Sequence, residues 1–140
     1  LSCGVLMGLA YLTPAMPPSS QVLPKDFPAP IRRFITAIPR FAGTISPVIT
    51  SDPLVESHYM TGPEGDLVIL ANWQPNPVKN LVVRFPGRPG VQRVRSLRAA
   101  GYFQGHLHEQ NRGELRVETT SGIPRVTLDL AVTDYLLIDE

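Results

Sequence analysis

Alternation of apolar and polar positions is the clearest signal in this sequence. Leu115 and Val117 alternate with Arg116 and Glu118, and residues 126–130 repeat the pattern. A period of two predicts β-strands that have one buried face and one face in water. Applied along the chain, it predicts strands at residues 48–50, 54–60, 67–73, 80–85, 91–97, 102–108, 114–119, 125–130 and 135–138.

The intervals between these stretches predict how the strands are connected. Most contain Gly, Pro or Asn, which break strands and form tight turns, at residues 61–66, 75–77, 86–90, 111–113 and 121–124. No long helical pattern is present to connect parallel strands. We therefore predict an all-β protein, an antiparallel β-sandwich. Residues 67–71 are apolar on both faces, so we expect an internal strand covered from both sides, with the N-terminal arm as one candidate cover.

Residues 1–44 follow a different pattern. Six prolines between positions 14 and 30 exclude a regular helix or a central strand and predict an extended Pro-rich arm. Residues 31–38 place Ile31, Phe34, Ile35 and Ile38 at helical spacing, which predicts one short helix ended by Pro39.

We interpret residues 1–44 as an N-terminal arm that is a possible remnant of a preceding domain, and residues 45–140 as the sandwich domain. The apolar start, residues 1–12, is not preceded by Lys or Arg and is too short to span a bilayer. We therefore expect the chain to be a fragment of a longer protein.

Composition narrows the function classes only a little. The 140 residues are 43% hydrophobic and 18% charged, with a net charge of +1 and 15 prolines. These values are typical of a folded domain and provide no overall field for nucleic acid or membrane binding. Basic side chains between positions 79 and 98 form a stripe without acids, but we expect them to pair across strands with the acids of the final segment. The single cysteine, Cys3, excludes an intrachain disulfide.

The strongest candidate for metal binding is the pair His106 and His108. Two residues apart on a strand, they share a face, but two ligands are too few for a stable site. A third ligand from His58, Glu109 or Glu56 would not stand at recognisable spacing. We therefore expect exposed strand histidines, with no metal and no cofactor, and keep a metalloenzyme as the weakest hypothesis.

Catalysis by carboxylates would require two acids about 5–10 Å apart across a glycosidic bond. The candidates fall where solvated strand positions or turns are expected, at Glu114, Glu118, Asp129 and Asp134. No Gly-x-Ser-x-Gly motif is present, and Cys3 has no adjacent base. We assign no catalytic residue and expect the fragment not to be an enzyme.

Two aromatic residues are candidates for ligand binding. Trp73 lies at a strand end, and Tyr102 lies where a loop becomes a strand. Sugar-binding sandwiches stack such rings on pyranose faces when the rings are exposed. The alternative for Trp73 is that it caps the core beside a Pro-rich turn.

Several strands together resemble a known family. Residues 64–73, 78–83, 126–130 and 134–138 resemble the small C-terminal β-domain of bacterial β-galactosidase-like glycoside hydrolases, and residues 4–12 look like the end of the trimerisation domain that precedes it. In that family the catalytic acids lie in a separate barrel. The resemblance implies a β-sandwich without catalytic residues.

The leading hypothesis is therefore a non-catalytic accessory β-sandwich from the C-terminus of a larger glycoside-hydrolase-like protein, with a role in packing and assembly. A carbohydrate-binding module that uses Trp73 and Tyr102 is the alternative. We expect other domains of the parent chain as partners, with a carbohydrate or a second copy of the chain as alternatives, and neither nucleic acid nor membrane. The cellular compartment stays open.

Overall fold

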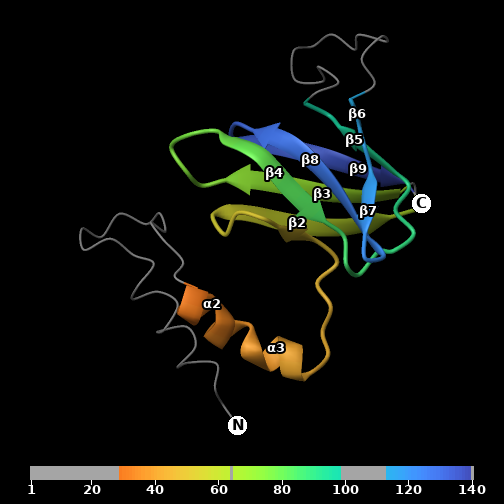
Figure 1. Ribbon diagram of the computed structural model, residues 1–140. Coiled ribbons are helices and arrows are strands. Elements are labelled where there is room, and N and C mark those ends of the chain that lie inside the picture. The colour runs from red at the N-terminus through yellow and green to blue at the C-terminus, as the bar shows by residue number, and fades with distance from the viewer. Residues whose placement is uncertain (1–28, 64, 99–112, 140) are drawn as a thin grey trace. The chain divides into compact units, whose positions relative to one another are not determined.

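The computed structural model describes residues 29–63, 65–98 and 113–139 (Figure 1). The chain divides into two compact units, Leu1–Ile45 and Ser46–Glu140. The predicted Pro-rich arm, residues 14–30, lies almost entirely outside the described residues.

The first unit contains two short helices, α2 (Ala29–Ile35) and α3 (Ala37–Phe41), where one helix over residues 31–38 was expected. Pro39 does not end the helical segment but lies in the first turn of α3, where a missing N–H costs nothing. Because Pro39 has no N–H and its ring crowds the preceding turn, it cannot donate a helical hydrogen bond to the carbonyl of Ile35, the last residue of α2. At the break, the Thr36 hydroxyl donates to the Arg32 carbonyl at 2.8 Å, a local bond that bends helices.

The second unit consists of two antiparallel sheets, which confirms the predicted all-β sandwich (Figure 1). One sheet has four strands in the order β1-β4-β8-β7, namely β1 (Ile49–Thr50), β4 (Val78–Arg84), β8 (Ile123–Leu130) and β7 (Glu118–Thr120). The other has five strands in the order β2-β3-β9-β5-β6, namely β2 (Val55–Gly62), β3 (Gly65–Asn72), β9 (Thr133–Asp139), β5 (Arg93–Ser96) and β6 (Glu114–Leu115).

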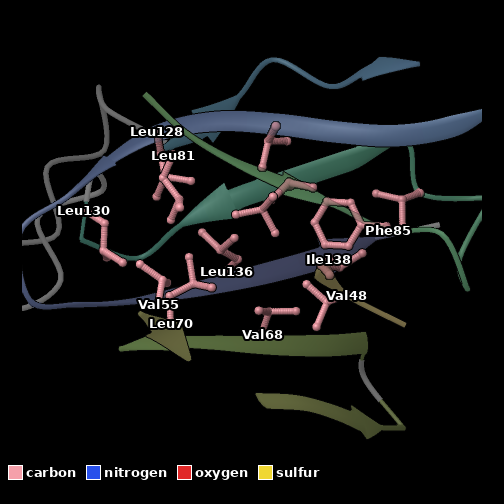
Figure 2. Close-up of a cluster of buried hydrophobic side chains, with 14 residues drawn as sticks. Val48, Val55, Val68, Leu70, Leu81, Phe85, Leu128, Leu130, Leu136 and Ile138 are labelled. Atoms are coloured by element: carbon pink, nitrogen blue, oxygen red, sulfur yellow. The ribbon is translucent and has the colours of Figure 1, made fainter. Parts of the chain in front are cut away.

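The hydrophobic core lies between the two sheets (Figure 2). Both sheets contribute apolar side chains at alternate positions, such as Val68 and Leu70 from β3 and Leu81 and Val83 from β4, all fully buried. Phe85, just after β4, is the largest fully buried side chain among the described residues. Burying one side chain of this size is worth about 1.5–3 kcal/mol, so the sum over the core provides the main favourable term.

The predicted strand at residues 114–119 is divided between the two sheets. Its first part, β6, pairs with β5 in the five-stranded sheet, whereas its second part, β7, pairs with β8 in the four-stranded sheet. The predicted alternation persists across the division, because Leu115 and Val117 pack against the core while Arg116 and Glu118 are exposed. This segment therefore crosses the edge of the sandwich. The predicted strand at residues 102–108 lies outside the described residues.

Candidate functional site

The outer face of the five-stranded sheet is rich in apolar side chains. The register aligns Met60, Leu67 and Leu137 in one row across β2, β3 and β9, and Ile69 and Tyr135 in the next. Met60 is exposed and the other four are half-buried. We call these five residues, which lie in two adjacent rows, the apolar row. Sheet faces that meet only water rarely have such a set.

The outer face of the four-stranded sheet is polar. Arg125 donates to Glu118 at 3.0 Å across β8 and β7, and Lys79 pairs with Asp129 at 2.7 Å across β4 and β8. Thr127 is exposed between them. The bond from Lys79 is the main cause that lowers the pKa of the Asp129 carboxyl below its ordinary 3.8, and the Asn80 N–H adds to it. The two outer faces are thus suited to different surroundings.

Trp73 marks one corner of the five-stranded sheet's outer face. The Trp73 N–H donates to the Leu54 carbonyl at 3.1 Å, which extends the pairing of β2 and β3 and places the indole on the same side as Ala71. Its Nε1–H donates to Glu56 Oε2 at 2.9 Å, while His58 Nε2 lies 2.8 Å from Glu56 Oε1. Trp73 does not belong to the core, and 46% of its surface is exposed.

A buried amide supports the turn that follows Trp73. Asn72 Nδ2 donates to the carbonyls of Asn76 and Ala131, both at 2.9 Å, and Asn72 Oδ1 accepts the Gln74 N–H at 3.0 Å. Asn72 is 8% exposed. It therefore connects the segment after β3 to the turn between β8 and β9, and both segments flank the Trp73 corner.

Two carboxylates are buried within the described part of the chain. Asp66 on β3 accepts bonds from the Tyr59 hydroxyl and the Arg88 guanidinium, and that guanidinium also lies 5.6 Å from the Tyr59 ring centre. Asp134 on β9 accepts the Ser96 hydroxyl at 2.6 Å. Asp134 pairs with Leu70, four residues along β3 from Asp66, which corresponds to roughly 13 Å along the strand. That separation exceeds the spacing of a glycosidase pair.

The four carboxylates that the sequence offers as candidates differ in their exposure to solvent. Glu114, Glu118 and Asp129 are exposed, as expected, and each pairs with a basic side chain of a neighbouring strand. The expectation that Asp134 is solvated is wrong, because only 3% of it is exposed. It shares the inward face of β9 with the core residue Leu136, and the Ser96 hydroxyl and the backbone N–H of Tyr135 satisfy its oxygens.

Part of the basic stripe has the cross-strand partners that the sequence predicts, since Lys79 pairs with Asp129 and Arg93 pairs with Glu114 across β5 and β6. Arg95 lies instead 3.5 Å from Asp139 across β5 and β9, and the partner of Arg88 is Asp66 of β3, outside the final segment. These pairs neutralise much of the positive charge locally.

Three of the sequence candidates, Tyr102, His106 and His108, lie outside the described residues. Among residues 29–63, 65–98 and 113–139, no three His, Cys, Asp or Glu side chains gather as a metal site would require. Neither α2 nor α3 has the length and apolar character to cross a membrane, and the described part of the chain contains no other helix that does.

Sequence reasoning missed that Glu56 and His58 belong with Trp73. The available signal was the turn at Gly62 and Gly65, since the register that pairs these two glycines also pairs Glu56 with Ala71. Alternation then places Glu56, His58 and Trp73 on one face.

Comparisons with known proteins bear on the fold. No protein family model matches the sequence, and no curated protein matches it. Among solved structures, α-L-fucosidase isoenzyme 2 from Paenibacillus thiaminolyticus is similar, with a TM-score of 0.54 and 12% sequence identity. The match covers 78% of this chain and 17% of the fucosidase chain. At this identity the likeness concerns the sandwich fold alone, and this chain spans only a small part of that hydrolase's length.

Proposed function

We propose that this chain is a non-catalytic accessory β-sandwich domain from the C-terminal part of a larger glycoside-hydrolase-like protein, where it serves packing and assembly. Two independent likenesses support the proposal. The strands at residues 64–73 and 126–130 resemble the C-terminal domain of bacterial β-galactosidase-like hydrolases, and the fold is similar to a minor part of a fucosidase chain.

The difference between the two outer faces is the observation that carries the proposal. The apolar row gains free energy when another surface covers it, at about 25 cal/mol per Å² removed from water, whereas the ion pairs of the four-stranded sheet would lose hydration on burial. The occupant that we propose for the apolar row is another domain of the same polypeptide. In the similar fucosidase the matched part is 17% of the chain, and the remainder of such a chain would provide neighbours of this kind.

The use of the buried carboxylates also supports a role without bond cleavage. Asp66 and Asp134 each accept bonds from donors of their own sandwich, and both contribute to the packing of the inward faces. A glycosidase requires instead two acids that face one open site.

The assembly role is tested by placing a charge in the apolar row. Isolated wild-type chain should bind a hydrophobic dye and associate weakly as its concentration rises, measured by light scattering. Leu67→Lys should remove both effects, whereas Val82→Lys, on the outer face of the four-stranded sheet, should leave them unchanged. A wild-type chain that stays monomeric and binds no dye would contradict the proposal. A tight dimer of fixed size would identify a second copy as the occupant instead.

The absence of catalysis has a separate test. The purified chain should release no chromophore from a panel of nitrophenyl glycosides. Hydrolysis that Asp134→Asn abolishes, while the variant keeps its circular dichroism spectrum, would overturn the proposal.

A further inference from the structure

The indole of Trp73 is exposed and is restrained by a hydrogen bond. Its Nε1–H donates to Glu56, and the second oxygen of the same carboxylate contacts His58 at 2.8 Å. The hydrogen bond therefore limits the freedom of a side chain whose surface is nearly half in water. A ring restrained in this way loses less rotational entropy when a ligand binds to it.

The Glu56 carboxylate has capacity for further hydrogen bonds. An ionised carboxylate provides about four acceptor positions, and the described contacts use two of them, one on each oxygen. The Glu56 side chain is 44% exposed and that of His58 is 62% exposed. Acceptors for hydroxyl groups are thus available at the edge of the exposed ring.

The sheet surface beside the ring is formed by small side chains. Ala71, two residues before Trp73, pairs with Thr133 of β9, and the alternation places both on the outer face with the indole. A flat ligand stacked on the indole can extend over Ala71 and Thr133, where the Arg98 guanidinium, which donates to the Thr133 carbonyl at 3.2 Å, lies beside it. His58 pairs with Ile69, so this corner borders the apolar row, whereas Glu56 pairs with Ala71, two residues farther along β3.

From this arrangement we infer that the Trp73 corner binds a neutral saccharide. The C–H face of a pyranose ring stacks on the indole, and its hydroxyl groups donate to Glu56 and exchange hydrogen bonds with His58. The Glu56 charge disfavours uronic acids and other anionic sugars. A single ring is a platform, whereas sites for organic cations surround the ligand with several rings. The inference concerns a different occupant from that of the accessory role, and none of its contacts uses the five residues of the apolar row.

The chain contains one tryptophan, so its fluorescence reports on this corner alone. Full-length chain is titrated with neutral cello-, xylo-, manno- and galacto-oligosaccharides, with trigalacturonate as the anionic probe and with tetramethylammonium chloride as the cation. We expect a saturable change of Trp73 emission with at least one neutral oligosaccharide, and none with the other two probes.

Three variants locate the binding site, with calorimetry as the measurement because Trp73→Ala removes the fluorophore. Trp73→Ala should abolish binding, and Glu56→Gln should weaken it about tenfold, since it replaces a charged acceptor. Glu118→Gln is the matched control, because its side chain is also 44% exposed and also pairs with a neighbour, but on the other sheet. It should bind like the wild type. Thermal melts establish that each variant is folded.

Three results would each overturn the inference. The first is saturation by tetramethylammonium without any response to the neutral sugars, which would identify a cation site. The second is the absence of any saturable response, and the third is sugar binding that survives in folded Trp73→Ala. None of the three would affect the association and turnover tests of the accessory role.

Discussion

Removal of the Asn72 amide tests whether one buried side chain holds the turns beside the Trp73 corner. Asn72→Ala deletes the three hydrogen bonds to Asn76, Ala131 and Gln74. At about 1 kcal/mol net for each bond, the free energy of unfolding should fall by about 3 kcal/mol. For a folded unit the size of Ser46–Glu140, this corresponds to a melting temperature roughly 10–20 °C lower.

The variant Asn72→Asp separates hydrogen bonding from size. The aspartate side chain of this variant would keep an acceptor for the Gln74 N–H. Its second oxygen, however, would face the carbonyl oxygens of Asn76 and Ala131, where the wild type has an amide donor. The variant should therefore be less stable than Asn72→Ala at pH 7. The introduced carboxyl, ordinarily near pKa ~3.9, should have a raised pKa in the folded state. The folded state then binds more protons than the unfolded state above about pH 4, so stability should fall as the pH rises through that window and recover on acidification.

Unfolding in urea is monitored by circular dichroism and by Trp73 fluorescence. The slope of the free energy of unfolding against urea concentration should be the same in all variants. Asn76→Ala is the matched control, because the described contact uses the Asn76 backbone carbonyl rather than its side chain. It should change stability by less than about 0.5 kcal/mol. An Asn72→Ala variant within that same margin of the control, or an Asn72→Asp variant that loses stability on acidification relative to Asn72→Ala, would refute the reasoning.

Two further predictions concern the core and the polar face. Phe85→Ala should lower the free energy of unfolding by about 3–5 kcal/mol, because it leaves a cavity between the sheets. Phe41→Ala, at a position 96% exposed, should change this free energy little. Equal effects of the two substitutions in urea unfolding would contradict the core assignment. In NMR titrations, Lys79→Met should raise the Asp129 pKa toward 3.8 without reaching it, since the Asn80 N–H still stabilises the anion. The pKa of Asp129 in the folded state lies below its pKa in the unfolded state. The carboxylate therefore contributes to stability above the unfolded pKa, and this contribution is lost as the pH falls through the folded pKa. An unchanged Asp129 pKa in Lys79→Met would contradict the assigned cause.

The strands were predictable because their signal is local. In β8 the inward positions from Val126 to Leu130 are apolar and the outward positions from Arg125 to Asp129 are polar, so the period of two is visible within this one strand. The same rule, applied to Asp134, Leu136 and Ile138, places Asp134 inward, but the acidic side chain suggested solvent instead. A buried carboxylate is favourable only when donors reach it, and the Ser96 hydroxyl that does so lies 38 residues away in sequence.

The candidate site was predictable only in part. Trp73 stands out as the one tryptophan, at a strand end. Whether it capped the core or faced water depended on the strand parity set by the β2–β3 register. Its contact with Glu56 spans 17 residues and follows from the same register. Tyr102, the other candidate, stays a prediction.

The fold class of this protein follows from the amino-acid sequence, because alternating burial and turn residues are short-range properties of each segment. These properties determine neither which strands pair nor which sheet each strand joins. The division of residues 114–119 between two sheets, the burial of Asp134 and the contact of Trp73 with Glu56 all depend on partners distant in the chain. These features become visible in the folded chain, since the hydrogen bonds and the packing that select them exist only when distant segments are brought together.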